Sequence, residues 1–255
     1  GDPDFFPVPV AKLTDKKYAT SLREQINLEE VSRSSDIRPG LDGNTAGKES
    51  TETTHFSAWD QWGNVVSNTY TLNFSYGSGI SVAGAGFLLN NEMDDFSSKP
   101  GSPNGYGLVG GVANAIEPGK RPLSSMTPTI VFDTTGAPML ATGSPGGSTI
   151  ITIVMQMVLN VIDFEMNVAE ATAASRIHHQ WLPDMVFYES GVSADTLQLL
   201  REMGHQLKDK TSRLGATQSI QAGATGTMVY GAADYRRDGS GAAVPALKGK
   251  AVVEK

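Results

Sequence analysis

The strongest constraint on the fold is a change of pattern at Thr53. Residues 36–52 are rich in glycine and polar side chains and show no periodicity, which is typical of a linker. From residue 54 to 59 apolar and polar side chains alternate as they do in a β-strand, and residues 60–64 supply turn-forming types. Residues 65–72 then have the composition of a returning strand. The pattern predicts a β-hairpin whose first strand begins near Thr53.

The rest of the chain predicts strands that come in hairpins and helices that cluster, which indicates an α+β fold. Helices are expected at 15–31, 149–163, 168–176 and 194–203, and strands at 81–89, 129–132, 139–142, 219–223 and 227–230.

Composition disfavours several classes of function. The chain has 255 residues, 39% hydrophobic and 18% charged, which is enough to bury a sizeable core in one large or two small domains. A net charge of −7 disfavours nucleic acid and anionic lipid as partners. The absence of cysteine rules out disulfides, thiolate metal sites and a cysteine nucleophile. No apolar run approaches the roughly 20 residues that a membrane-spanning helix needs.

Thr53 is a candidate nucleophile if the chain is cut before it. An internal threonine hydroxyl needs a nearby base, whereas a threonine at a chain terminus carries its own α-amino group. That amine has a pKa of about 7.7–8.0, so it can accept a proton near neutral pH. Cleavage between Glu52 and Thr53 would create nucleophile and base together. Taken alone, the pattern favours a structural threonine at the start of a strand.

Residues 90–95, Asn-Asn-Glu-Met-Asp-Asp, place three carboxylates within four positions at the end of a predicted strand. Glu92, Asp94 and Asp95 could hold an ammonium group, or Ca²⁺, which takes oxygen ligands. The segment lacks the EF-hand spacing, which disfavours calcium. Taken alone, a solvated acidic loop is the simpler interpretation.

Two further segments are suited to anions. The hydroxyls of Ser124 and Ser125 can donate to a carboxylate, although a Ser-Ser pair is more often part of a turn or cap. The loop 143–148, Gly-Ser-Pro-Gly-Gly-Ser, precedes a predicted helix, where successive N–H groups form an anion site. It lacks the ending of a phosphate-binding loop, so an oxyanion hole or a tight structural turn remain as interpretations. The adjacent His178 and His179 would point in different directions on a helix, which disfavours zinc.

Taken in order, these segments resemble one family. The strings TTHFSAWDQWGN, TYTLN, LLNNEMDDFS, KRPLSSMTPTI, TGSPGGS, NVAEATAASRIHHQWLP and GATQSI are similar to the C-terminal part of bacterial γ-glutamyltranspeptidases, and the resemblance extends to about Asp234. It implies an N-terminal-nucleophile hydrolase with an αββα sandwich, of which this chain would form the C-terminal half. Residues 1–52 would be the tail of a large subunit and a linker ending at a self-cleavage site. Residues 53–255 would be the small catalytic subunit, with a lid at about 97–111 and a disordered tail after about 238.

The resemblance also implies roles for single residues. Thr53 would be the nucleophile, freed by autocatalytic cleavage of the Glu52–Thr53 bond, and Thr71 would hydrogen-bond to it. Gly146 and Gly147 would supply the N–H groups of the oxyanion hole. The residues that would bind the glutamyl group are Asn73, Glu92 and Asp95 at its α-amino end, Ser124 and Ser125 at its α-carboxylate, and Tyr106 as a gate above it.

Three departures from the family pattern accompany the match. The upstream half, with an arginine expected to pair with the substrate carboxylate, is absent. Glu92 stands where some bacterial relatives carry glutamine. The stretch that begins Asp234-Tyr235-Arg236 differs from the usual Asp-Pro-Arg ending.

The implied activity is cleavage of the γ-glutamyl amide of glutathione and related compounds through an ester on Thr53, with transfer to amino acids, peptides or water. No cofactor or metal is implied. The expected partners are γ-glutamyl compounds, amino-acid or peptide acceptors and the large subunit of the same precursor. The family implies a periplasmic or secreted protein, although the chain has no recognisable signal segment. Two alternatives stay open: a glutaryl or cephalosporin acylase on the same scaffold, which would not need to hold an ammonium group, and a non-catalytic fragment.

Overall fold

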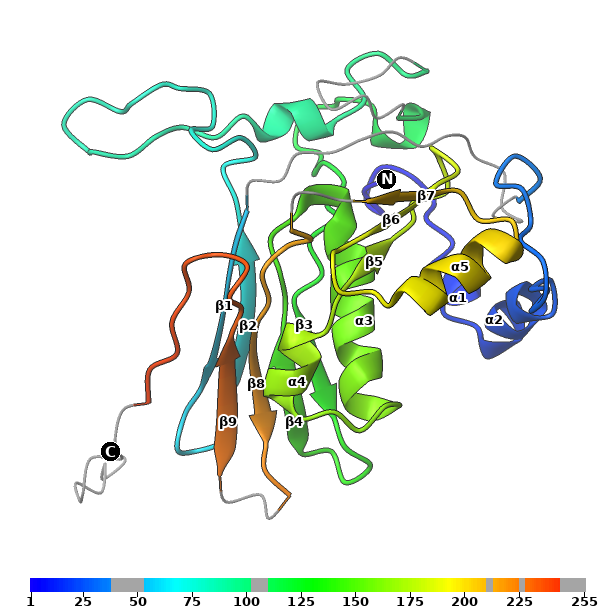
Figure 1. The fold of residues 1–255 in the computed structure, drawn as a ribbon. Coiled ribbons are helices and arrows are strands. Elements are labelled where there is room, and N and C mark those ends of the chain that lie inside the picture. Colours follow the sequence, from blue (N-terminus) through cyan, green and yellow to red (C-terminus); the bar gives the residue numbers. More distant parts are fainter. Residues whose placement is uncertain (38–52, 102–109, 210–212, 225–227, 244–255) are drawn as a thin grey trace.

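The structure is a computed structural model that describes residues 1–37, 53–101, 110–209, 213–224 and 228–243. Two β-sheets dominate it (Figure 1). Both predicted hairpins near Thr53 and residue 135 are confirmed, as is the pair of strands before Asp234. The two-stranded sheet contains β1 (Thr54–Trp59) and β2 (Val65–Tyr70), and the four-stranded sheet has the order β3 (Thr129–Phe132), β4 (Pro138–Thr142), β8 (Gln218–Ala222) and β9 (Val229–Ala233).

The two sheets face each other, and helices cover the far side of the larger one. Strand β1 contacts β8 and β4, while β2 contacts β4 and β3. Helices α3 (Ile150–Ile162) and α4 (Val168–Ala173) pack on the opposite face of the four-stranded sheet (Figure 1). The described residues therefore form three consecutive layers, sheet, sheet and helices, of the predicted αββα sandwich.

Helix α3 supplies much of the core. Its buried side chains recur at helical spacing and pack with Leu140 of β4 and Val168 and Ala171 of α4. Strand β4 has both faces covered, so Leu140, Ala141 and Thr142 are all buried instead of alternating with exposed side chains. Within the described ranges, no helix has the length and apolar character needed to cross a bilayer.

A third, smaller sheet was not predicted. It contains β5 (Ile177–His178), β6 (Val186–Tyr188) and β7 (Leu207–Asp209), and helix α5 (Ala194–Glu202) connects the parallel strands β6 and β7. These strands have two or three residues each, which is too short for an alternating pattern to be recognised.

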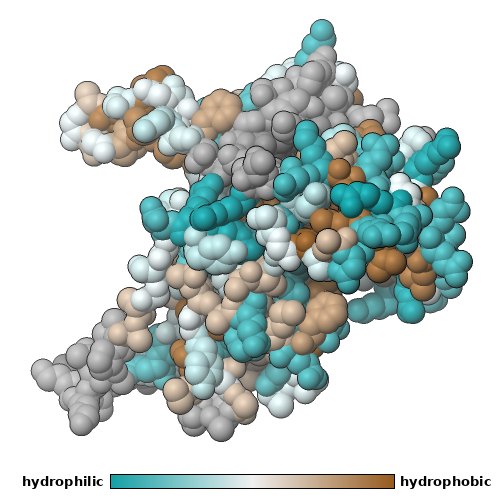
Figure 2. All heavy atoms as spheres, viewed as in Figure 1, coloured by the Kyte–Doolittle hydropathy of each residue, from teal (hydrophilic) through white to brown (hydrophobic). Residues whose placement is uncertain are grey.

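One predicted helix is too long, and one predicted strand is wrong. The helix expected over 15–31 is α2 (Lys16–Arg23), preceded by α1 (Val10–Leu13); Asp15 caps the N-terminus of α2, and a chain of turns follows it. The strand expected over 81–89 is a projecting turn-rich segment with a single bridge between Ser81 and Leu88. Its Gly84 and Gly86 have φ near +75°, a conformation that interrupts a strand. Figure 2 shows apolar side chains among polar ones on this projection, and Phe87 is 54% exposed.

The N-terminal segment is fixed by polar contacts to distant parts of the chain. The buried carboxylate of Asp2 accepts from the backbone N and from Nε of Arg121, both at 2.9 Å. Ser34 donates its backbone N–H and its hydroxyl to Asp184, at 2.9 and 2.8 Å. These contacts hold residues 1–37 against two parts of the chain: the segment around Arg121, and the segment around Asp184 that follows β5.

Leu140→Ala tests the packing of the three layers. Leu140 is fully buried between the sheets and helix α3, so its truncation should lower the free energy of unfolding by about 2–5 kcal/mol. Urea unfolding followed by circular dichroism measures the change. Leu199→Ala on α5 is the control, because Leu199 is 60% exposed and its loss should cost less than about 0.5 kcal/mol. Equal losses for both variants would contradict this account of the core.

Candidate active site

Most of the predicted site residues gather around one small pocket at the upper end of the β1–β2 hairpin. Gly146 directly precedes the pocket-lining Gly147, and Glu92 hydrogen-bonds to Asp95. Tyr106 and Glu52 lie outside the described residues. The pocket is lined by Thr53, Thr71, Asn73, Asp95, Leu123, Ser124, Ser125, Met126, Gly147 and Ile150.

The hairpin explains why the first three of these residues meet. Thr54 pairs with Tyr70, so Thr53 and Thr71 lie at the same end of the two strands. Thr71 Oγ1 accepts a hydrogen bond from the backbone N–H of Asn73 at 2.9 Å. Thr53 also lines a broader groove along β1, β8 and β9, but no other predicted site residue lines that groove. The small pocket is therefore the candidate site.

Asn73 has a strained backbone at the pocket wall. Its φ is +74°, in the left-handed region that asparagine tolerates better than most residues but still at a cost. The side chain is buried, and Nδ2 donates to the carbonyl of Asn91 at 3.1 Å. This bond joins the end of β2 to the acidic segment and helps to stabilise the strained conformation of Asn73.

The acidic segment carries a carboxyl group that resists ionisation. Burial raises the pKa of Asp95 to about 7. The hydrogen bond that the protonated Asp95 donates to Glu92 and the negative charges of Glu92 and Asp94 contribute in the same direction. Oε1 of Glu92 is buried and has no hydrogen-bond partner among the described residues. A cation placed here would relieve the repulsion and satisfy these oxygens.

The glycine loop before α3 has a backbone that only glycine adopts easily. Gly146 and Gly147 have φ of +142° and +58°. A Cβ on Gly146 would also lie 2.6 Å from Thr149 Oγ1, which donates to the Gly146 carbonyl. The 3₁₀ turn η3 (Gly147–Thr149) follows and leads directly into α3. The first N–H groups of a helix have no partner within it, so this loop is suited to an anion.

His55 lies in β1, and the family resemblance implied no role for it, but its side chain contacts this loop. Burial lowers the pKa of His55 to about 4, so the ring is neutral at pH 7. Its nitrogens contact Thr69 Oγ1 at 2.7 Å and Ser57 Oγ at 3.2 Å. A Cβ on Gly143 would lie 2.2 Å from His55 Cε1, so the ring packs directly on the backbone of Gly143. His55 thus fixes the distance between the strand that follows Thr53 and the glycine loop.

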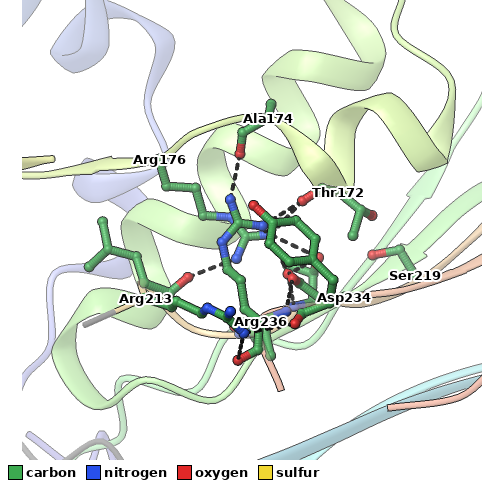
Figure 3. Close-up of polar contacts among 12 residues, drawn as sticks. Thr172, Ala174, Arg176, Arg213, Ser219, Asp234 and Arg236 are labelled. Atoms are coloured by element: carbon green, nitrogen blue, oxygen red, sulfur yellow. Dashed lines mark hydrogen bonds and ion pairs between the residues drawn. The ribbon is translucent and has the colours of Figure 1, made fainter. Parts of the chain in front are cut away.

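A network of buried charges includes Arg176, Asp234 and Arg236 (Figure 3). Arg236 donates to Glu189 at 2.8 and 2.7 Å, and Arg176 donates to Asp234 at 2.7 Å. All four residues are at most 7% exposed. Burial opposes ionisation of Asp234, but the charges of Arg176 and Arg236 and backbone N–H groups keep its pKa below the ordinary value.

The network reaches the glycine loop through the loop 213–217. Glu189 accepts from Leu214 N at 2.7 Å, and Asp234 accepts from Thr217 N at 2.8 Å. The backbone N–H of Ala216 donates in turn to Ser144 Oγ at 3.0 Å. Four buried charges, contributed by three segments of the chain, therefore fix the backbone that lies against residues 144–147.

The two adjacent histidines have separate contacts. His178 is buried, with Nδ1 2.8 Å from Thr152 Oγ1 on α3 and Nε2 3.0 Å from Gln180 Oε1. The same Gln180 oxygen accepts from Ser148 Oγ at 2.9 Å. His179 Nε2 instead lies 3.3 Å from Asp184. His178 thus connects the first turn of α3 to Gln180.

Comparison with known proteins identifies the family of the chain. The family described as gamma-glutamyltranspeptidase matches residues 1–244. The chain belongs to the gamma-glutamyltranspeptidase family. It is 56% identical over 236 residues to the glutathione hydrolase proenzyme of Escherichia coli K12, which covers 92% of this chain and 40% of that relative. The chain thus spans about 40% of the length of this curated relative.

Solved structures confirm the predicted N-terminal-nucleophile hydrolase fold. The T380A mutant of Helicobacter pylori gamma-glutamyltranspeptidase is 56% identical and has a TM-score of 0.68, covering 72% of this chain and 100% of that chain. The cephalosporin acylase of Bacillus halodurans is 26% identical and has a TM-score of 0.74, covering 94% of this chain and 40% of that chain. The scaffold is thus shared by a transpeptidase and an acylase.

Glu189→Gln tests the buried network. The substitution removes one charge and places an amide N–H where four N–H donors converge, so it should lower the free energy of unfolding by about 3–5 kcal/mol. Urea unfolding measures this loss. Glu202→Gln, on the exposed side of α5, is the control and should change stability by less than about 0.5 kcal/mol. An unchanged unfolding midpoint for Glu189→Gln would contradict the assigned role of the network.

Proposed function

We propose that this chain provides the catalytic small subunit of a γ-glutamyltransferase that also hydrolyses glutathione. One observation carries the proposal: Thr53 shares a single pocket with a carboxyl cluster, a pair of serine hydroxyls and a helix-start glycine loop. The α-carbon of a γ-glutamyl group bears an ammonium and a carboxylate, and the two kinds of wall match these groups. The name of the E. coli relative, a glutathione hydrolase proenzyme, supports the same substrate class.

Maturation begins with attack of Thr53 Oγ on the Glu52 carbonyl carbon. The resulting ester is hydrolysed, which leaves the Glu52 carboxylate on one chain and a free α-amino group on Thr53. Residues 1–52 then end the large subunit, and residues 53–255 form the small one. Two findings support cleavage: relatives are named proenzymes, and a complete chain of the H. pylori neighbour corresponds to 72% of this chain.

In the mature enzyme, the α-amino group of Thr53 takes the hydroxyl proton while Oγ attacks the γ-carbonyl carbon. Thr71 supports the orientation of this hydroxyl. The oxyanion accepts hydrogen bonds from the N–H groups of Gly146 and Gly147, and the proton passes to the leaving amine. The γ-glutamyl ester on Thr53 then reacts with the amine of an amino acid or peptide, or with water, which regenerates Thr53.

The two charged groups of the glutamyl substrate bind to two different walls of the pocket, an ammonium wall and a carboxylate wall. Asn73, Glu92 and Asp95 hold the ammonium, and Ser124 and Ser125 donate to the carboxylate. Tyr106 would gate the site from the loop at about 97–111, whose middle lies outside the described residues. We place the enzyme in the periplasm or outside the cell, as the family resemblance implies, and cell fractionation tests this location.

A glutaryl amide acylase is the second candidate, because the B. halodurans acylase shares the scaffold. A glutaryl group has no ammonium, so it leaves the buried carboxyl cluster without a charge partner. The raised pKa of Asp95 and the buried Glu92 oxygen favour γ-glutamyl substrates.

Thr53→Ala tests the nucleophile. Expressed together with the upstream half that the relatives possess, the variant should remain uncut and lose γ-glutamyl anilide hydrolysis to background, because it lacks the attacking oxygen. Intact mass and N-terminal sequencing detect the cut, and the wild type should yield a chain that starts Thr-Thr-His. Thr54→Ala, at an exposed position outside the pocket, is the matched control. Normal cleavage and turnover by Thr53→Ala would disprove the assignment.

The raised pKa of Asp95 predicts a pH-dependent choice of substrate. Below about pH 7 the carboxyl is neutral and attracts an ammonium weakly; above it, the carboxylate attracts it strongly. The ratio of kcat/KM for a γ-glutamyl anilide to that for a glutaryl anilide should rise by up to about tenfold per pH unit and level off above the pKa. Titration of the Thr53 amine cancels in this ratio. Asp95→Asn should give a low, flat ratio, and an unchanged profile in that variant would exclude Asp95 as the cause.

A further inference from the structure

We propose that Asn114 is a positioning residue that sets the spacing between the ammonium wall and the carboxylate wall of the pocket, and thereby its preference for γ-glutamyl groups. The proposal rests on the function proposed above. Asn114 does not line the pocket, and no motif in the sequence pointed to it.

The side chain of Asn114 bridges two residues that do line the pocket. Its Nδ2 donates to the backbone carbonyl of Asp95 at 2.7 Å, and its Oδ1 accepts from the backbone N–H of Leu123 at 2.9 Å. Asp95 carries the carboxyl of the ammonium wall, and Leu123 directly precedes Ser124 and Ser125. One planar amide group therefore connects the backbones of both walls.

The backbone of Asn114 is itself fixed. It ends the 3₁₀ turn η2 (Val112–Asn114), and its carbonyl accepts from Ser97 N at 2.9 Å. Ser97 also forms a bridge with Ala115, and Asn114 is 5% exposed. The amide cannot swing away without breaking its part-buried bonds to the carbonyl of Asp95 and the N–H of Leu123. Its two bonds thus act as a spacer of fixed length.

Few side chains can replace this spacer. Aspartate keeps an oxygen for Leu123 N but has no donor for the Asp95 carbonyl, and alanine reaches neither. The requirement is strict because the ammonium and carboxylate of a γ-glutamyl group sit on one carbon atom. A shift of either wall leaves one of the two groups badly held, whereas a glutaryl group, with no ammonium, has less to lose.

The test compares Asn114→Ala and Asn114→Asp with the wild type, each produced with the upstream half. Three anilide donors are used: γ-glutamyl, glutaryl, which lacks the α-amino group, and 4-aminobutyryl, which lacks the α-carboxylate. Because the lost interaction is made equally before and during reaction, Asn114→Ala should raise KM for the γ-glutamyl donor at least about tenfold, with kcat within about threefold. Its preference for γ-glutamyl over glutaryl should fall about tenfold.

Asn114→Asp distinguishes the contribution of one wall from that of the other. It also provides a second test if the alanine variant fails to fold. It should lose the preference for γ-glutamyl over glutaryl while it keeps the preference over 4-aminobutyryl, because the contact to Leu123 remains. Asn64→Ala is the control, since it removes an amide hydrogen bond in the exposed β1–β2 turn. Equal losses on all three donors, or none, would overturn the positioning role. A wild type that ignores γ-glutamyl anilide would instead refute the proposed function.

Discussion

The buried charges of Arg176, Glu189, Asp234 and Arg236 are the constraint on which the site depends. An isolated charge in such an environment would cost several kcal/mol, so each must find its partner for the fold to be stable. The four residues come from three segments of the chain, and three of their other bonds go to backbone groups of the loop 213–217. Satisfying the charges therefore also fixes the loop that supports Ser144. Ordinary hydrophobic packing has no such directional requirement.

Local patterns predicted the hairpins and the long helix. The spacing of apolar side chains and the turn-forming residues specify those elements within a few positions. They failed at 81–89, where the apolar side chains Ile80, Phe87 and Leu89 mimic a strand but left-handed glycines turn the chain. They also overextended the helix at 15–31, since propensity gives no sign of where tertiary contacts end. The short strands β5, β6 and β7 form only through pairing with distant residues, which no local window contains.

Residues at the site were predictable when a motif carried their chemistry, and hidden when they act through the backbone. Thr53, Asp95 and the serine pair were found through the family resemblance. His55, Asn114 and the charge network were missed because an isolated histidine, asparagine or arginine has no distinctive spacing. Each of them holds backbone segments that are far apart in sequence, and such a contact becomes visible only in three dimensions.

The carboxyl groups of the pocket lower the free energy of unfolding, and the size of this effect depends on pH. The pKa of Asp95 rises from an ordinary 3.8 to about 7, chiefly because the group is buried. The stabilisation that belongs to the neutral carboxyl is therefore complete in acid and lost as the pH rises through about 7. An empty pocket at neutral pH is thus strained in the same place where a bound ammonium would relieve it.

The contacts of Asp2 and Ser34 acquire a different meaning once the chain is cut. In the precursor, Asp2–Arg121 and Ser34–Asp184 are contacts within one polypeptide, and the covalent tether keeps their effective concentration high. After the proposed cleavage the same atoms join two polypeptides, so their strength depends on protein concentration. Arg121 is largely exposed, so dissolved salt would screen its ion pair. Dilution in high salt would therefore loosen the mature enzyme at this end while leaving the precursor intact.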